Sequence, residues 1–178
     1  MKYRDVTIFS GQAFTVPQGV QRIDHRSTHG WQLRYAGTRL FSDHSADGSG
    51  AARALSAAVK ELRVRIRQQP APARLQQGPA ANKSSDLPVG VSGPLVRRRP
   101  GANVHEASFA VSVPRFGASS QRRSVYIANE NTWSDERYAQ ALARAVAIRA
   151  AAGQAYRLDA TQAKRAEARC LKATPRAR

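Results

Sequence analysis

The sequence predicts an α+β fold made of two small modules, each a three-stranded antiparallel sheet packed against one helix. The first observation is an internal repeat, because residues 19–66 recur in degraded form within residues 90–153. The second is the alternation of apolar and polar residues over short stretches, which is typical of half-buried strands. The third is an alanine-rich segment with a helical apolar stripe at the end of each copy. A repeat of this length indicates an architecture of two similar units.

The first copy contains one well-marked strand and one well-marked helix. Trp31, Leu33 and Tyr35 alternate with polar residues, so this strand should turn one apolar face to a core, with Trp31 buried rather than stacked on a ligand. A second short strand is expected at residues 39–42, and Asp47 or Ser49 should cap the helix that follows. The helix is expected over residues 51–66, with an apolar stripe of Leu55, Ala58, Val59, Leu62 and Ile66.

The second copy repeats this order. An alternating strand is expected at residues 109–113, a turn at 117–121 and a strand at 123–128. Ser134 is a good N-cap for the next helix, which should end at Gly153. Its apolar stripe should consist of Tyr138, Ala141, Leu142, Ala145, Ile148 and Ala152. The motif Ala54-Leu55-x-x-Ala58 aligns with Ala141-Leu142-x-x-Ala145, and this is the closest match between the copies.

Three segments lie outside the two copies. Residues 1–18 read as a β-prone arm that could form a hairpin or add an edge strand. Residues 67–89 contain prolines and no periodicity, so they predict a flexible linker between the modules. Residues 154–178 carry seven basic residues against two acidic ones and predict a C-terminal tail that grips phosphate, in which residues 159–171 could form a short helix.

The charge points to a polyanionic partner. The chain has 29 Lys and Arg against 12 Asp and Glu, a net charge of +17. Such an imbalance speaks of partners rather than of fold, and nucleic acid is the first candidate. Arg outnumbers Lys, and Arg can form paired hydrogen bonds to phosphate or to guanine. A genome rich in G and C would also favour Arg over Lys.

Other functional classes find little support in the residues. Cys170 is the single cysteine, so no disulfide framework is expected and a reducing interior is favoured. No apolar run has the length of a membrane span, and we expect a cytoplasmic or nucleoid-associated protein. His25 and His29 have no third ligand nearby, and Gly48-Ser49-Gly50 lacks the lysine of a phosphate loop. We therefore expect no catalytic residue, no metal site and no cofactor.

The order of elements resembles a known DNA-binding family. The residues that carry the resemblance are Gly19-Val20-x-Arg22, Trp31-x-Leu33-x-Tyr35, Leu40-Phe41 and Ala51-Ala52-x-Ala54-Leu55-x-x-Ala58 in the first copy, and Gly90-Val91, Phe109-x-Val111-x-Val113, Val125-Tyr126 and Ala139-x-Ala141-Leu142-x-x-Ala145 in the second. They resemble the APETALA-two (ethylene-response-factor) domain of plant, phage and bacterial mobile-element proteins. Such a resemblance implies duplex DNA binding with the sheet in the major groove, which admits a β-ribbon. We therefore expect a transcriptional regulator or a nucleoid-associated protein, with a phage or mobile element as one candidate origin.

The resemblance also implies which residues touch DNA. Carried over by position, the first copy would use Arg22, Gln32, Arg34 and Arg39 on its strands, and His25 and Arg26 on a loop. The second copy departs from the pattern, because Ala110 and Ser112 replace long donors on the central strand. Its expected contacts, which would grip phosphates more than bases, are Arg97, Arg98, Arg99, Ser112, Arg115, Arg122 and Arg123.

Two alternatives remain open at this point. The protein could bind RNA through the same surfaces, or it could be an adaptor that binds an acidic protein partner through its basic face. A preference for duplex over single strands would favour DNA, and a partner that survives nuclease treatment would favour the adaptor. The sequence does not decide the oligomeric state.

Overall fold

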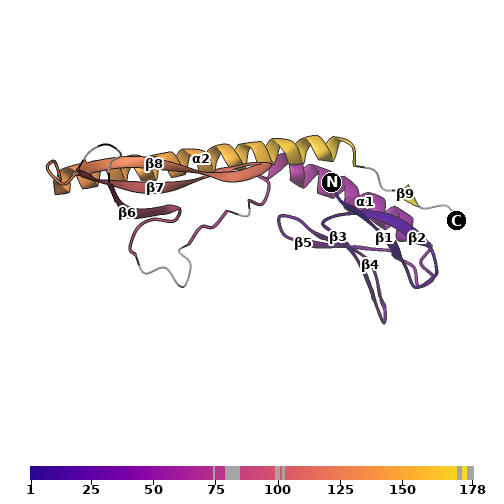
Figure 1. The fold of residues 1–178 in the computed structure, drawn as a ribbon. Helices are drawn as coiled ribbons and strands as arrows, with labels where there is room; N and C mark the ends of the chain where they lie inside the picture. Colours follow the sequence, from indigo (N-terminus) through magenta and orange to yellow (C-terminus); the bar gives the residue numbers. More distant parts are fainter. Residues whose placement is uncertain (74, 79–84, 99–100, 102, 172–173, 176–178) are drawn as a thin grey trace. The chain divides into compact units, whose positions relative to one another are not determined.

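The computed structural model describes the chain except for residues 74, 79–84, 99–100, 102, 172–173 and 176–178 (Figure 1). In the described residues it contains two helices and three antiparallel sheets of three strands each, so the predicted α+β class is confirmed. The chain divides into two compact units. Unit 1 comprises residues 1–71 and 161–178, and unit 2 comprises residues 72–160.

The first sheet of unit 1, sheet A, is built from the two ends of the chain. Strands β1 (Tyr3–Thr7) and β2 (Ala13–Pro17) form an antiparallel hairpin, and β9 (Thr174–Pro175) pairs with β2. The predicted N-terminal arm is therefore a hairpin. Phe14 and Val16 are buried in the core of unit 1, and the ring of Phe14 meets that of Trp31 edge to face.

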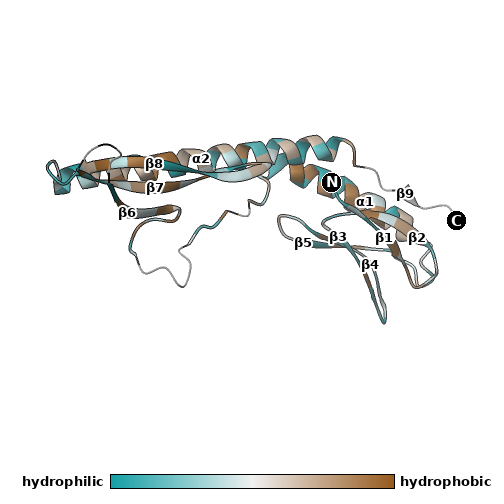
Figure 2. Ribbon diagram, viewed as in Figure 1, coloured by the Kyte–Doolittle hydropathy of each residue, from teal (hydrophilic) through white to brown (hydrophobic). Residues whose placement is uncertain are grey.

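Sheet B of unit 1 is the sheet predicted for the first copy. It consists of β3 (Val20–His25), β4 (Thr28–Arg34) and β5 (Thr38–Ser42), in the order β3-β4-β5. Trp31 and Leu33 on the central strand are fully buried, which confirms Trp31 as a core residue. The β3–β4 turn is hydrophilic and lies at the end of the hairpin (Figure 2).

Helix α1 (Ala51–Gln68) covers one face of sheet B. The predicted stripe of Leu55, Ala58, Val59, Leu62 and Ile66 is buried. The helix ends just before Gln69-Pro70, as expected from the proline. The prediction that Asp47 or Ser49 caps the helix was wrong: Gly50 is the N-cap and no side chain caps it. The polar side chains of this loop accept hydrogen bonds one turn earlier, from the N–H groups of Ser49 and Gly50.

Unit 2 contains sheet C, formed by β6 (Val91–Arg98), β7 (His105–Arg115) and β8 (Ala118–Asn129). Residues 117–121 were predicted as a turn, but β8 already begins at Ala118. The turn consists of Phe116 and Gly117 alone, and Gly117 takes the positive φ that short hairpin turns require. The first residues of β8 are small and polar, so they show no alternation from which a strand could be predicted.

Helix α2 (Asp135–Arg169) is much longer than predicted. Ser134 caps its start, because its Oγ accepts the N–H of Arg137 at 3.2 Å. The predicted stripe from Tyr138 to Ala152 packs on sheet C as expected. The predicted end at Gly153 was wrong: good helix formers stand on both sides of this glycine, and together they outweigh its cost of about 1 kcal/mol. The predicted basic tail is thus helical to Arg169.

The end of the chain also belongs to a core. Ala168 and Leu171 are buried in the core of unit 1, with Leu171 fully buried. Residues 154–178 are therefore not a separate tail in their described part. The predicted layout of two modules is matched in part, because each of sheets B and C packs on one helix, but unit 1 also contains sheet A and the end of α2.

The internal repeat is visible in the strand register. Val20 pairs with Leu33 in sheet B, and Val91 pairs with Val111 in sheet C. The glycine before each valine has a positive φ, +100° at Gly19 and +81° at Gly90. Its carbonyl accepts the N–H of the second strand at 2.7 Å, from Arg34 in one case and Ser112 in the other. The aligned positions of the two copies are therefore structurally equivalent at this point.

Candidate nucleic-acid interface

The outward face of sheet B is the face turned away from α1. Residues paired across antiparallel strands lie on the same face of the sheet. Trp31, Leu33 and their partners therefore form the inward set, and the residues that alternate with them along each strand form the outward set. The outward face consists of Gln21, Ile23, His25, Thr28, Gly30, Gln32, Arg34, Thr38, Leu40 and Ser42. Of the contacts predicted for the first copy, Gln32, Arg34 and His25 therefore lie on this face.

Arg34 is the cation best placed on the outward face of sheet B. Its Nε donates a hydrogen bond to the side-chain oxygen of Gln32, which lies on the same face. A hollow of about 370 Å³ is lined by Arg34, by Arg4 of β1 and by Lys2, the residue just before β1. Arg4 donates to the carbonyl of Val20 at 3.1 Å, which ties β1 to the edge of sheet B. Lys2 and Arg4 were not among the predicted contacts, and the positive charge of the N-terminal segment was the sequence signal that could have identified them.

Two predicted contacts lie on the other face. Arg22 pairs with Trp31 and Arg39 pairs with Leu33, so strand register places both on the inward side of sheet B. The prediction that they point outward was wrong. Parity within each strand could have shown this, since Val20 and Phe41 are apolar neighbours two residues away. Arg39 reaches towards Glu61 of α1 at 3.9 Å and lies over the ring of Phe41.

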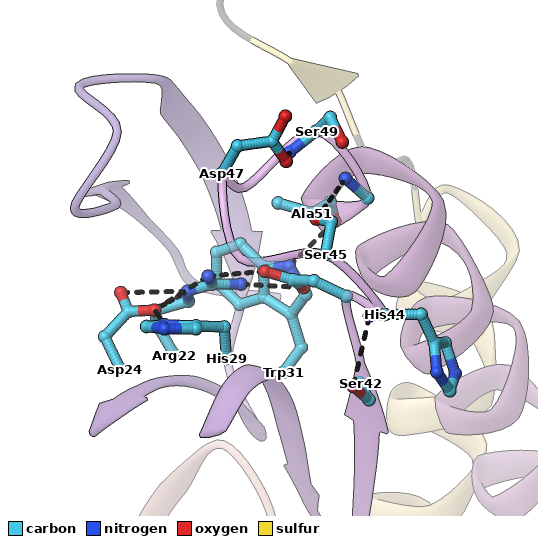
Figure 3. Close-up of polar contacts among 12 residues, drawn as sticks. Arg22, Asp24, His29, Trp31, Ser42, His44, Ser45, Asp47, Ser49 and Ala51 are labelled. Carbon is cyan, nitrogen blue, oxygen red and sulfur yellow. Dashed lines mark hydrogen bonds and ion pairs between the residues drawn. The ribbon is translucent and has the colours of Figure 1, made fainter. Parts of the chain in front are cut away.

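The side chain of Arg22 is buried and connects several groups within unit 1 (Figure 3). Its side chain is only 6% exposed, and its two terminal nitrogens donate to both oxygens of Asp43, at 3.0 and 2.6 Å. It also donates to Asp24 at 3.0 Å and lies 5.0 Å from the ring centre of Trp31. The indole N–H of Trp31 donates in turn to the carbonyl of Ala51 at 2.9 Å, at the start of α1.

The charges of this cluster stabilise one another. Burial lowers the pKa of Arg22, but the hydrogen bonds and charges of Asp43 and Asp24 outweigh burial and raise it above its ordinary value. Burial raises the pKa of Asp24, but Arg22 and His29 outweigh it and lower the pKa. Arg22 is thus held as a cation between two carboxylates, and we assign it to the fold rather than to a ligand.

The remaining first-copy residues lie at the β3–β4 turn. His25 ends β3 and pairs with Thr28, and Arg26 stands in the turn with a positive φ of 47°. Both side chains are exposed at the tip of the hairpin. They therefore extend the outward face towards solvent.

The outward face of sheet C faces away from α2 and has a similar position in unit 2. It carries Ser92, Leu95, Arg97, Glu106, Ser108, Ala110, Ser112, Arg122, Ser124 and Tyr126. Small residues occupy its centre, which leaves a hollow of about 550 Å³. Arg97, Arg122 and Arg123 line this hollow together with Glu106 and Tyr126, whose side chain is 45% exposed.

The arginines predicted for the second copy differ in their surroundings. Arg122 pairs with Ser112 in the middle of β8, and not at a strand end as expected, because β8 begins earlier than predicted. Arg123 pairs with Val111, so it starts from the inward side and only borders the hollow. Arg98 donates to Asn103 and Arg115 to the carbonyl of Ser119. Arg99 lies outside the described residues.

Two arginines of α2 bind the sheet itself. Arg144 donates to the carbonyl of Tyr126 at 3.3 Å, and Arg149 donates to the carbonyl of Ser112 at 3.1 Å. These contacts fix α2 on sheet C and leave the outward side chains of Tyr126 and Ser112 free of the helix. Net charge alone therefore overstates the number of cations that a ligand can reach.

The described residues contain no group of three His, Cys, Asp or Glu side chains that could hold a metal ion. In the same part of the chain, neither helix combines the length and the apolarity needed to span a membrane. No family model matches the chain, and no curated protein or solved structure gives a significant match either.

Proposed function

We propose that this protein binds duplex DNA through the outward faces of sheets B and C. The observation that carries the proposal is that a cationic hollow lies on the face of sheet C turned away from α2, and that another cationic hollow borders the outward face of sheet B beside β1. In unit 1 the hollow is lined by Lys2, Arg4 and Arg34, and in unit 2 by Arg97 and Arg122. The polyanionic backbone of DNA complements such surfaces, and the formal charge of +17 would draw it towards the chain.

The two faces should differ in what they recognise. Arg34 and Gln32 stand side by side on a central strand, and both are able to form paired hydrogen bonds to base edges in a major groove. Sheet C offers serines and alanine at the corresponding centre, with arginine only at the rim. We therefore assign base reading to unit 1 and phosphate binding to unit 2, within the two-module arrangement that the APETALA-two resemblance implies.

A salt titration of the full chain tests this function. Duplex affinity should fall steeply as salt rises, with a slope of about −0.9 for each phosphate contact. Arg122→Gln should flatten the slope by about one contact, whereas Arg137→Gln, an equal loss of charge at an exposed position in the first turn of α2 and outside the hollow, should leave it unchanged. Affinity that is independent of salt, or equal slopes in both variants, would contradict DNA binding by sheet C.

One observation favours a second candidate function. Tyr126 is exposed on the outward face of sheet C beside Leu95, and exposed aromatic residues on sheets stack on the bases of single strands. Single-stranded RNA or DNA would then be the ligand of unit 2. Tyr126→Ala should weaken single-strand binding by about 1–3 kcal/mol for each stacked base, and a duplex preference that survives this change would exclude this candidate.

A further inference from the structure

A third cationic surface lies in unit 1, away from the sheets. Arg63 and Arg67 of α1 and Arg165 and Arg169 of α2 line a hollow of about 600 Å³, with the small residue Ala168 among them. Each pair is spaced four residues apart, so its two members project from the same face of their helix. Because α1 covers the inward face of sheet B, these arginines belong to the helix layer and not to the outward face of that sheet.

The four arginines have no anionic partner within the described residues. Glu61 is bound to Arg65, and Glu167 is bound to Lys164 and to the amino group of Met1. These are the carboxylates of the two helical segments that line the hollow, and both are engaged elsewhere. Four guanidinium groups around one hollow repel one another, and like charges spaced four residues apart destabilise each helix.

Helix ends explain only half of the cluster. Arg67 and Arg169 stand in the last turns of α1 and α2, where a cation interacts favourably with the helix dipole. Arg63 and Arg165 stand one turn earlier, where this effect has largely faded. The charge of Arg165 also acts on Tyr35, whose buried hydroxyl has no hydrogen-bond partner in the described part of the chain. Neither an ion pair within the described residues nor the helix dipole therefore explains why arginine stands at positions 63 and 165.

We propose that this arginine hollow is a phosphate-binding site, distinct from the sheet faces. Guanidinium groups bind phosphate oxygens through paired, charge-assisted hydrogen bonds, and a bound phosphate would remove the repulsion among the four cations. The phosphates could belong to a polynucleotide backbone or to a small polyphosphate, since both present the same oxygens. In the first case the chain would hold nucleic acid on two sides of unit 1.

Calorimetric titration of the full chain with tripolyphosphate tests the site without any nucleic acid. Arg63→Gln with Arg67→Gln, and separately Arg165→Gln with Arg169→Gln, should weaken one tripolyphosphate site at least about tenfold, as expected when a charge-assisted hydrogen bond is lost. Gln has nearly the helix propensity of Arg, so both double variants should fold, and circular dichroism checks this. Arg63→Lys with Arg67→Lys keeps the charge and should lose only part of the affinity.

The matched control removes the same charge from the same helix. Arg53→Gln with Lys60→Gln lies on α1 but outside the hollow, so it should retain the site within about threefold in screening salt. Unchanged affinity in both hollow variants, or an equal loss in the control, would overturn the proposal. Displacement of tripolyphosphate by a short duplex would identify the polynucleotide backbone as the source of the phosphate, and retention would identify a small polyphosphate; either result supports the site.

Discussion

The pair formed by Arg22 and Asp43 shows how a cation can be withdrawn from the ligand-binding surface. The side chain of Asp43 is fully buried and accepts two hydrogen bonds from Arg22, while Trp31 lies under the guanidinium. The cluster joins β3 to the loop after β5 and, through the indole N–H, to α1. A charge of this kind contributes to unit 1 as a fixed internal contact, and removing one partner leaves the other buried without its counter-ion.

Asp43→Asn should therefore destabilise the protein by about 3 kcal/mol, at the low end for a broken buried pair because Asp24 still holds Arg22. Chemical denaturation of the full chain measures this. Asp47→Asn is the matched control, since Asp47 is exposed and its amide counterpart can still accept the N–H of Ser49. The control should change stability by no more than about 0.5 kcal/mol. Equal effects of the two substitutions would mean that the buried pair contributes nothing.

At the scale of elements, α2 shows that the helix propensity of the surrounding residues outweighs Gly153, the glycine that was predicted to end the helix. Gly153 was expected to end the helix, yet α2 continues through it to Arg169, and nothing lies within 4 Å of the place where a side chain would begin. Gly153→Ala should then stabilise the protein by about 0.5–1 kcal/mol, because glycine loses more backbone entropy in a helix interior than alanine does. Thermal denaturation measures the change. A destabilised variant would indicate that Gly153 takes a positive φ and ends the helix.

The segment just after α2 tests whether the end of the chain is a tail or part of a core. Leu171, two residues beyond the end of α2, is fully buried in the core of unit 1, while Leu158 within α2 is 63% exposed. Leu171→Ala should cost about 2–5 kcal/mol, as for other buried leucines, and Leu158→Ala should cost little. Deletion of residues 154–178 is for this reason no clean test of phosphate binding by a tail, because it would remove buried side chains as well. Equal stability of the two leucine variants would support the prediction that the end of the chain is a tail and not part of a core.

Alternation and helical stripes predicted the elements well but their ends and faces poorly. The buried sets of β4, α1 and the first half of α2 follow from local apolar periodicity, so residues such as Trp31 and Ala145 could be placed from the sequence. The outward position of Arg34 follows from the same alternation. Arg22 and Arg39 were misplaced because a family pattern was given more weight than the parity of their own strands.

Some features were beyond local reasoning. The pairing of β9 with β2 and the burial of Leu171 in unit 1 join segments about 150 residues apart, and no local pattern specifies such contacts. The arginine hollow depends on the same long-range association, since its two pairs come from α1 and from the end of α2. The sequence showed these arginines only as the polar faces of helices.

At the scale of the whole molecule, the two units repeat one sheet-and-helix arrangement with different outward faces. Each outward sheet face alone presents few cations, Arg34 on sheet B and Arg97 and Arg122 on sheet C. Two weak contacts joined in one chain can raise the overall affinity by about 10²–10⁴-fold when both reach one ligand. We therefore propose that the full chain, rather than either unit, is the functional DNA-binding species.

The measurement that tests the central proposal most directly is the affinity of Arg34→Ala for a duplex selected from a random pool at near-physiological salt. Arg34 is exposed at the C-terminal end of β4, so the variant should fold with a change of no more than about 0.5 kcal/mol. Binding to the selected site should weaken by about 1–3 kcal/mol and discrimination at one base position should relax, whereas Arg53→Ala on α1 should bind as the unmodified protein does. Normal affinity with full sequence preference in Arg34→Ala would contradict DNA reading by sheet B.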